Sequence, residues 1–336
     1  MGAIGPASEC NAVGMRPLPG VPCAAMMDAA HRRHPEPHLA LVPDACYLCK
    51  GGRLRQRFAA RDGGAPEGAA AYNCTSFGHR SHPPIWECRD CGMLFQWPMR
   101  SAHELLRAYQ DVEDPLYVAE KGNRYHTFRR VLRALGPAGG RTLLDVGAYC
   151  GYFLDVAREG GFRPEGLELS RWAAGHARSL GFTVHGMPLA ELAAKGTQYD
   201  VVTLWDVVEH FADPREELAA AFRLVRPGGR IYLSTIDASS LVARLLGGQW
   251  PWLMDMHLFY FGRATLAALL EEVGFRVTDV RTYTHIISAD YLLRKVGASF
   301  TPAAPVLEGL RRVVPGGWAI PFNLGDNMLM AAERPG

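Results

Sequence analysis

The chain has 336 residues, of which 48% are hydrophobic and 21% are charged, a composition typical of globular proteins that excludes global disorder. The 36 lysines and arginines nearly balance the 34 aspartates and glutamates, leaving a formal net charge of +2. This balance disfavours a strong non-specific grip on nucleic-acid phosphates. No apolar run reaches the roughly 18 residues of a membrane span, and the first residues lack the basic and apolar segments of a secretory signal. We therefore expect a cytoplasmic protein without a transmembrane segment.

Residues 1–43 are rich in Ala, Pro, Gly, Met and His and show no sustained period of 2 or 3.6. Within them, His31 to His38 alternates polar residues and prolines and cannot bury a core. A His-rich stretch can bind metal, but this composition favours a flexible tail. We predict a disordered or loosely attached leader.

Two Cys-x-x-Cys pairs come next, Cys46 with Cys49 and Cys88 with Cys91, and a turn containing glycine comes after each pair. Two such knuckles place four thiolates at the corners of a tetrahedron, which is the geometry of zinc in closed structural sites. Glycine lets the backbone turn back, so that its amides can face the sulfurs. The sequence therefore predicts a zinc-binding module over residues 44–100, with a flexible insert at residues 62–71.

A disulfide-bonded pair and a redox role are the alternatives for these four thiols. His79 and His82 lie between the knuckles and are the candidate replacement ligands. Four cysteine ligands leave no open coordination position, so the zinc would hold the fold and would not catalyse. The other cysteines show no such pairing and are expected to be ordinary thiols: Cys10, Cys23, Cys74 and Cys150.

Residues 101–140 are predicted to form a helical connector between this module and the rest of the chain. Ser101 and Glu104 match a capping box at the start of a helix. A second helix is expected from Tyr125 to Leu135, where Gly136 and Pro137 stop it.

From residue 141 onward, strands and helices alternate. A buried strand at residues 141–146, a glycine turn at residues 147–151 and a helix at residues 152–159 form the first half of a nucleotide-binding α/β unit. The turn is not the dinucleotide fingerprint, because it lacks that spacing and the middle glycine. Glu168 lies 21 residues past Gly147, where an acidic side chain can accept hydrogen bonds from both ribose hydroxyls.

Further strands and helices are expected after this unit. The strands span residues 164–169, 182–185, 199–205, 230–235, 275–284 and 327–333. The helices span residues 170–181, 213–229 and 263–273, and the stretch from Ile286 to Pro321 is expected to be helical and partly apolar. That stretch could be a lid, a dimer surface or a lipid-facing patch.

In this order and spacing, the motifs resemble class I S-adenosylmethionine-dependent methyltransferases. The motifs are Leu144-Asp-Val-Gly147, Gly151-Tyr-Phe, Gly166-Leu-Glu168, Tyr199 to Asp206, Glu209-His210, Arg226 to Gly229 and Leu269 to Phe275. The resemblance implies an α/β fold with a Rossmann-like seven-stranded sheet whose last strand is antiparallel, a methyltransferase domain over residues 141–336, and S-adenosylmethionine as the cofactor. The knuckle region is similar to the module that precedes many bacterial methyltransferases of sugar, lipid-glycan and natural-product pathways.

The resemblance also implies which residues contact the cofactor. Gly147 and its neighbours would line the methionine part, Glu168 would hold the ribose, and Met187 would lie near the adenine. Trp205 would face the sulfonium, although a core aromatic is the competing interpretation, as loop packing is for Met187. The implied cofactor-binding set is Asp145, Gly147, Ala148, Tyr149, Gly151, Glu168, Leu169, Met187, Trp205 and Asp206.

Tyr149 is a departure from the family, whose loop usually has a glycine at this position. A Cβ there crowds a backbone that normally approaches the cofactor, and a bulky residue is strained at positive φ. Because Asp145, Gly147, Gly151 and Glu168 remain, we expect the loop to bind the cofactor still.

The chemistry requires an in-line displacement, in which the alignment of donor and acceptor supplies most of the catalysis. A hydroxyl acceptor also needs a base, most often histidine. His257 lies in an aromatic and Met-rich segment with Asp255 and Tyr260 close by in sequence, and His210 comes after the fourth strand. We predict these four residues as catalytic, with helix capping or packing as the alternative for His257 and a structural turn for His210.

Three functions remain open. The first is methylation of a small-molecule acceptor (a sugar, glycan-lipid or natural-product intermediate), most simply at oxygen, with C-methylation of a sugar as its variant. The second is methylation of an RNA base, which the near-neutral charge and the lack of interleaved basic and aromatic residues around the knuckles disfavour. The third is a decayed site that serves as a binding module. The first predicts a small-molecule partner and no nucleic acid, and leaves a homodimer open.

Overall fold

The computed structural model describes residues 42–64, 68–75, 81–299, 302 and 304–336. The leader predicted at residues 1–43 lies almost entirely outside the described residues, and so does His79. Residues 43–336 form one compact unit. Within the described part of the chain, no helix combines the length and apolar character needed to cross a bilayer.

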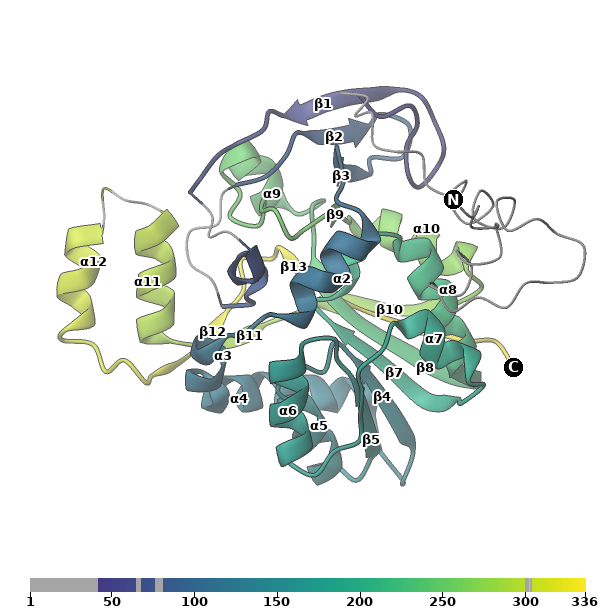
Figure 1. The fold of residues 1–336 in the computed structure, drawn as a ribbon. Coiled ribbons are helices and arrows are strands. Elements are labelled where there is room, and N and C mark those ends of the chain that lie inside the picture. The colour runs from purple at the N-terminus through teal and green to yellow at the C-terminus, as the bar shows by residue number, and fades with distance from the viewer. Residues whose placement is uncertain (1–41, 65–67, 76–80, 300–301, 303) are drawn as a thin grey trace, which may run out of the picture. The chain divides into compact units, whose positions relative to one another are not determined.

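A seven-stranded sheet is the centre of this unit, in the order β10-β13-β8-β7-β4-β5-β6 (Figure 1). Strands β4 to β8 are parallel, whereas β13 is antiparallel to both β8 and β10. The α/β Rossmann-like methyltransferase fold predicted from the sequence is therefore confirmed, including its antiparallel last strand. The strands are β4 (Thr142–Val146), β5 (Arg163–Leu167), β6 (Val184–His185), β7 (Tyr199–Trp205), β8 (Val225–Ile236), β10 (Arg276–Thr282) and β13 (Asn327–Glu333).

Helices cover both faces of this sheet. Successive residues of a strand point to opposite faces, so apolar side chains on each face need a layer of helices to bury them. On β4, Leu144 packs in one apolar cluster and Leu143 in another. The helices from the connector onward are α2 (Ala102–Gln110), α3 (Pro115–Ala119), α4 (Lys121–Leu132), α5 (Tyr152–Glu159), α6 (Arg171–Ser179), α7 (Leu189–Ala194), α8 (Pro214–Leu224), α9 (Leu241–Leu246) and α10 (Arg263–Glu272). Short 3₁₀ turns are η2 (Gly68–Tyr72), η3 (Arg133–Leu135), η4 (Val208–His210) and η5 (Gly247–Gln249).

Helix boundaries match their capping residues. Ser101 and Glu104 form both hydrogen bonds of the predicted capping box at the start of α2. One expected boundary is wrong: α8 ends at Leu224, and residues 226–229, expected to close that helix, already belong to β8. This extension is stabilised by Arg226, whose guanidinium donates to Asp200 beside the start of β7 at 2.7 Å.

A second sheet has the order β1-β2-β3-β9 and carries the cysteine knuckles. Its strands are β1 (Leu54–Phe58), β2 (Ile85–Cys88), β3 (Leu94–Gln96) and β9 (Phe259–Tyr260). Because β9 comes from a segment far along the chain, this sheet is completed by residues that come after β8. The division at residues 44–100, 101–140 and 141–336 stays a prediction.

The stretch from Ile286 to Pro321 is only partly helical. A hairpin of β11 (His285–Ser288) and β12 (Ala319–Phe322) encloses α11 (Ala289–Ser299) and α12 (Ala304–Arg311). Trp318 is 61% exposed and Val306 is 67% exposed, so an apolar surface accompanies this hairpin.

The turn that opens α5 depends on a glycine without space for a side chain. Gly151 has a φ of +77°, and a Cβ there would lie 2.8 Å from Cβ of Ala177. We expect Gly151→Ala to lower the free energy of unfolding by about 2–4 kcal/mol, because strain and overpacking add. The control is Gly175→Ala on α6, where a Cβ would meet nothing within 4 Å and should stabilise by about 1 kcal/mol. Urea unfolding of both variants checks this, and equal effects would contradict it.

Candidate functional site

Four cysteine sulfurs converge between the two knuckles. The sulfurs of Cys46 and Cys91 are 3.6 Å apart and those of Cys49 and Cys88 are 3.5 Å apart, and all four lie within 4.8 Å of one another. A disulfide would need about 2.05 Å, whereas tetrahedral zinc with Zn–S bonds of about 2.3 Å separates sulfurs by roughly 3.8 Å. The four sulfurs are therefore too far apart for disulfides, and their separations are compatible with a zinc site.

The turn after each knuckle has a left-handed residue at the same position. This residue is Gly92 in the second knuckle, as expected, but Lys50 in the first, with a φ of 59°. At Gly51, a Cβ would lie 3.3 Å from the Cys49 sulfur and would displace the carboxylate of Asp90. His82 does not belong to the thiol cluster, and its Nδ1 donates to the Pro83 carbonyl at 2.7 Å.

The glycine turn between β4 and α5 is held to the end of β5. The amides of Gly147 and Ala148 both donate to the Leu167 carbonyl. One carboxylate oxygen of Glu168 accepts from the Tyr149 amide at 2.8 Å, and the other accepts from the Ser170 amide at 2.7 Å. Burial raises the pKa of Glu168, while these backbone donors act against the rise. Glu168 thus joins the glycine turn to the start of α6, at the carboxyl ends of two parallel strands.

Tyr149 adopts the strained conformation that its position in the turn predicts, with a φ of 47°. Its ring makes edge contacts with Tyr117, at a centroid distance of 4.5 Å, and with Trp172, at 6.3 Å. Its hydroxyl is buried without a hydrogen-bond partner among the described residues. Gly147 is exposed, and a Cβ there would come 2.7 Å from Val207. The tyrosine ring therefore packs toward α3 and α6, and Gly147 stays open.

Several predicted cofactor residues are buried in the core instead of lining an open surface. Asp145 accepts a hydrogen bond from the Thr203 hydroxyl at 2.6 Å, and burial raises its pKa to about 8. Trp205 packs edge-on against Phe153 and stacks with Tyr283. The remaining members are buried or half-buried: Ala148, Leu169 and Met187.

Asp206 comes directly after β7 and has a φ of 55°. Its carboxylate accepts from the Ser234 hydroxyl at 2.7 Å and lies 3.8 Å from Nε2 of His285. The side chain remains 38% exposed, so a carboxylate with free acceptor capacity lies at the carboxyl edge of the sheet.

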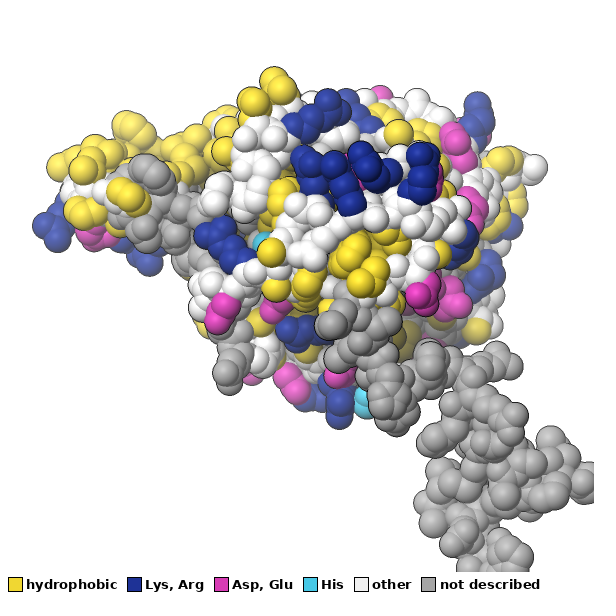
Figure 2. All heavy atoms as spheres, turned by 90° about the horizontal axis from the view of Figure 1, so that it is seen from above, with side chains coloured by type: hydrophobic (Ala, Val, Ile, Leu, Met, Phe, Trp, Pro, Cys, Tyr) yellow, Lys and Arg dark blue, Asp and Glu magenta, His cyan; other side chains and the backbone are white. Residues whose placement is uncertain are grey.

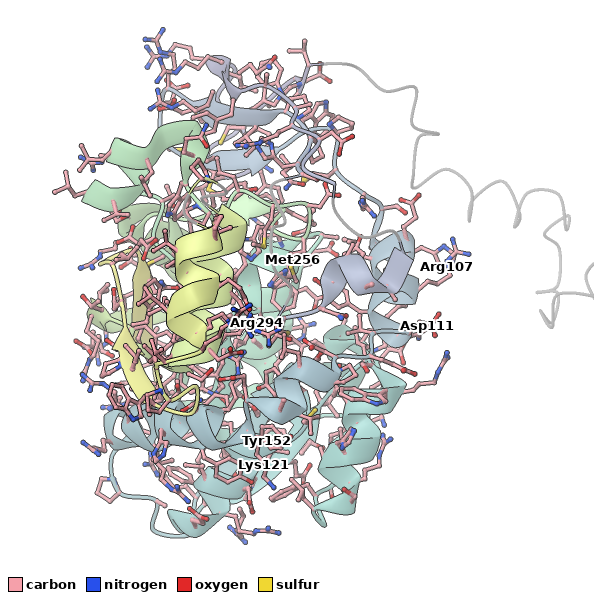
Figure 3. All side chains as sticks on the ribbon, turned by 90° about the vertical axis from the view of Figure 1, so that its left-hand side faces the viewer. Arg107, Asp111, Lys121, Tyr152, Met256 and Arg294 are labelled. Carbon is pink, nitrogen blue, oxygen red and sulfur yellow. The ribbon has the colours of Figure 1, made fainter. Side chains whose placement is uncertain are left out.

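Beside Asp206, two histidines and a glutamate form a cluster. Glu209, His210 and His257 each place one potential ligand atom within 4.8 Å of the others. Nδ1 of His210 lies 2.8 Å from the carbonyl oxygen of Met256, and Nδ1 of His257 lies 2.9 Å from that of Trp252 (Met256 is labelled in Figure 3). Because a carbonyl only accepts, each Nδ1 carries the proton and each Nε2 is an unprotonated acceptor.

Burial determines the charges of this cluster. It raises the pKa of Glu209 to about 8, with the charge of Asp206 adding to the rise. It lowers the pKa of His210 to about 4 and that of His257 well below its usual value. One carboxylate oxygen of Glu209 has no hydrogen-bond partner among the described residues, an arrangement that costs about 1–3 kcal/mol. The cluster therefore consists of neutral imidazoles beside an unsatisfied carboxyl group.

The other two predicted catalytic residues have partners outside this cluster. Asp255 forms an ion pair with Arg100 at 3.2 Å. Tyr260 is fully buried, and its hydroxyl accepts from Gln96 at 3.1 Å and donates to Met254 at 3.3 Å. Its ring lies 6.3 Å from that of His257, so its contribution is to position the histidine segment.

The sequence motifs include Glu209 only as part of a family pattern and do not predict it as a site residue. Its signal is the Glu-His pair just past the end of a buried strand. Two cations also escape prediction, Arg124 over the Tyr117 ring at 4.5 Å and Lys295 over the Trp252 ring at 4.1 Å. These lie on α4 and α11, whose sequences carry no motif.

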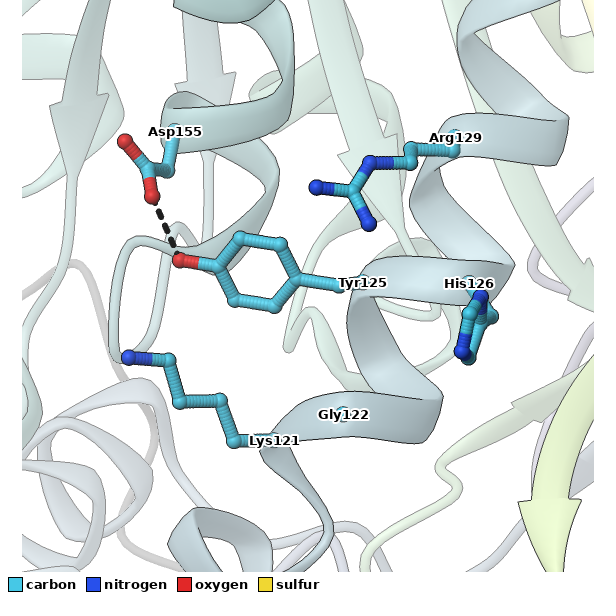
Figure 4. A pocket seen from close by; sticks show the side chains of 6 residues that line it. All are labelled: Lys121, Gly122, Tyr125, His126, Arg129 and Asp155. Atoms are coloured by element: carbon cyan, nitrogen blue, oxygen red, sulfur yellow. Dashed lines mark hydrogen bonds between the residues drawn. The ribbon is translucent and has the colours of Figure 1, made fainter. Parts of the chain in front are cut away.

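A surface pocket of about 450 Å³ lies elsewhere, along α4 and α5 (Figure 4). It contains the hydrogen bond from the Tyr125 hydroxyl to Asp155 at 2.6 Å. None of its lining residues belongs to the predicted cofactor or catalytic sets: Lys121, Gly122, Tyr125, His126, Arg129 and Asp155.

Comparison with known families matches residues 119–280 to the family described as methyltransferase domain. The chain is 31% identical over 157 residues to the ubiquinone biosynthesis O-methyltransferase of Aeromonas salmonicida, a match that covers 42% of this chain and 65% of that protein. It is 30% identical over 160 residues to the protein of the same name from Bordetella avium, with 44% and 66% covered. The chain thus spans just under two thirds of the length of these two relatives.

Solved structures resemble the chain more distantly. A SAM-dependent methyltransferase from Archaeoglobus fulgidus has a TM-score of 0.44 and 20% identity, and the match covers 66% of this chain and 100% of that one. The YcgJ protein of Bacillus subtilis has a TM-score of 0.46 and 15% identity, with 63% and 99% covered.

Proposed function

We propose that this chain, whose residues 119–280 match a methyltransferase-domain family, is a class I S-adenosylmethionine-dependent methyltransferase that transfers a methyl group to an oxygen of a small-molecule acceptor. The observation that carries the proposal is the cluster of Glu209, His210 and His257 beside Asp206, at the edge of the sheet that also holds the glycine turn. The relatives named O-methyltransferases support oxygen as the acceptor atom.

The residues of the glycine turn fit the cofactor. Gly147 is exposed and free of a side chain, and Glu168 keeps acceptor lone pairs beyond its two backbone hydrogen bonds. Gly147 would then contact the methionine part and Glu168 the ribose hydroxyls. When bound, S-adenosylmethionine supplies a methyl group on a positively charged sulfur.

The chain's own contribution is to align the acceptor and to take its proton. The Nε2 atoms of His257 and His210 are unprotonated and can accept a proton, because their Nδ1 atoms carry the ring protons and donate them to backbone carbonyls. The buried Glu209 fixes the local turn through its backbone, since its carbonyl accepts from the Leu258 amide at 2.9 Å. In this arrangement the histidines act as general bases on the hydroxyl.

The rival functions have weaker support. The decayed-site hypothesis depends on Tyr149, yet its ring packs on Tyr117 and leaves Gly147 exposed. For RNA, Figure 2 shows lysine and arginine side chains gathered over the β1–β2 face. However, Arg53 pairs there with Asp90, and Arg55 with Glu87 at 2.6 Å, so part of this charge is neutralised.

The acceptor atom can be identified with S-adenosylmethionine carrying a ¹³C-labelled methyl group. The purified protein would be incubated with small hydroxyl-bearing acceptors (phenols, catechols and sugars) and, separately, with RNA. We expect label on an oxygen of a small molecule, read from the ¹³C chemical shift. Label on carbon, on nitrogen or in the RNA fraction would contradict the proposal.

We further propose that the four thiols bind one structural zinc ion. The sulfur separations match tetrahedral coordination, and four thiolates leave no position for a reacting group. The ion would then link the two knuckles that begin and end the β1–β2 hairpin.

Removing one thiolate is expected to release the zinc. Cys88 is fully buried, so Cys88→Ser should lower the free energy of unfolding by at least about 3 kcal/mol, or roughly 5 °C in Tm for a unit of this size. Metal analysis should find one zinc per chain in the wild type and much less in the variant. Cys74→Ser, outside the knuckles, is the control. Zinc well below one per chain in fresh wild-type protein would count against the proposal.

A further inference from the structure

In the histidine cluster, Glu209, His210 and His257 each place one nitrogen or oxygen atom within 4.8 Å of the others. His210 and His257 present unprotonated Nε2 atoms, and Glu209 presents a carboxylate oxygen without a partner in the described part of the chain. Glu209 is 1% exposed and His257 is 5% exposed. Lone pairs gathered in a buried space repel one another unless a proton or a metal cation lies among them. The arrangement therefore suits a bound cation.

The surroundings of the two imidazoles are those of metal ligands. A metal-binding histidine nearly always donates its other ring N–H to a carbonyl or carboxylate, which fixes the ring and its tautomer. His210 does this to Met256 and His257 to Trp252. The His210 ring is also held by an edge contact with Tyr109 at 6.2 Å. Both ligand atoms are thus oriented before any ion arrives.

We propose that Glu209, His210 and His257 bind a divalent transition-metal cation, distinct from the ion of the four thiols. Two imidazole nitrogens and a carboxylate oxygen suit Mn²⁺, Fe²⁺, Co²⁺ or Zn²⁺, and three protein ligands leave coordination positions open. The carboxylate of Asp206, three residues before Glu209 along the chain, adds negative charge on the exposed side of the cluster.

The cation also narrows the acceptor class, a step that rests on the proposed methyl transfer. Two neighbouring open coordination positions on the proposed cation would be filled best by two adjacent oxygens of one acceptor, as in a catechol or a vicinal sugar diol. The bound hydroxyl releases its proton to water, and its oxygen then attacks the methyl carbon while the carbon–sulfur bond breaks to leave a thioether. In the metal-loaded protein the cation would activate the hydroxyl by lowering its pKa. This would replace proton removal by a free imidazole.

The test uses the full chain with zinc kept in the thiol site, dialysed separately against Mn²⁺ and Co²⁺ and then analysed for bound metal. We expect the wild type to bind one Mn²⁺ or Co²⁺ per chain in addition to zinc, with the affinity reduced at least tenfold in Glu209→Gln and His257→Asn. The matched control is His82→Asn, because His82 is also buried with its Nδ1 on a carbonyl but lies outside the cluster. Circular dichroism checks that each variant is folded.

Binding of neither metal beyond the thiol site would overturn the inference, as would binding that both variants retain. That outcome would leave the proposed function intact, with His257 as a base. Conversely, metal binding without any methyl transfer would count against the proposed function alone. In an active metal-loaded enzyme, acceptors with two adjacent hydroxyls should be preferred at least tenfold over those with one of them blocked, and equal rates would contradict the acceptor class.

Discussion

Glu168→Ala is expected to weaken S-adenosylmethionine binding about 100-fold, because it removes the carboxylate proposed to accept from two ribose hydroxyls. Hydrogen bonds to a charged group contribute about 1.5–3 kcal/mol each, and a loss of about 3 kcal/mol corresponds to roughly 100-fold. The same carboxylate orders the turn through the amides of Tyr149 and Ser170. Calorimetric titration with S-adenosylmethionine measures the change directly.

Two matched variants separate the role of the charge from a general effect on the strand. Glu168→Gln keeps the shape of the side chain but replaces one accepting oxygen with an NH₂ group. It therefore removes the charge and one of the two backbone hydrogen bonds, and should weaken binding by at least about tenfold. Glu165→Gln alters a carboxylate on β5 that contacts His185 and Tyr199 and should change the affinity by less than about twofold. An affinity of Glu168→Ala close to the wild-type value would remove Glu168 from the cofactor site.

His257→Ala is expected to reduce kcat about 10²–10⁴-fold while leaving the affinity for S-adenosylmethionine within about twofold, as for the loss of a group that activates the acceptor. His257 lies in the cluster beside Asp206, whereas the proposed ribose contact is at Glu168, so the two functions should separate. Single-turnover methyl transfer and cofactor titration on the same preparation give both quantities.

Two histidine controls make this result specific. His103 is exposed on α2, and His103→Ala should leave turnover unchanged. His82→Asn reproduces the loss of a buried histidine that is hydrogen-bonded to a carbonyl, and it should also keep kcat. Unchanged turnover in His257→Ala would exclude this residue from the mechanism, and an equal loss in His82→Asn would point to stability instead.

Much of the fold could be predicted because its signals are local. Strand β7, Tyr199–Trp205, and helix α5, Tyr152–Glu159, have the expected boundaries, since a continuous apolar run and a glycine turn delimit them. The predicted start of β8 was wrong because Arg226-Pro-Gly-Gly229 has the local composition of a turn. These residues form an irregularity within β8, with a φ of +74° at Gly228. Their place in the strand depends on the pairing of Val225 with Tyr199 and on hydrogen bonds to Arg334, which no local pattern reports.

In the candidate site, too, the features with local sequence signals could be predicted and those that depend on long-range contacts could not. The four cysteines could be grouped from their spacing, because the coordination geometry is encoded in each short motif. The pairing of His210 with His257, whose rings lie 4.9 Å apart, could not be, since 47 positions separate them and β8 lies between. The motifs identify Asp145 and Trp205 but do not predict that their side chains point into the core. That direction results from the contacts of Asp145 with Thr203 and of Trp205 with Tyr283.

The central claim, that the glycine turn and Glu168 form a working cofactor site despite Tyr149, is tested most directly by calorimetric titration of the wild-type protein with S-adenosylmethionine. We predict saturable binding at one site per chain, with competition by S-adenosylhomocysteine. The absence of detectable binding by folded, zinc-loaded protein would contradict this claim.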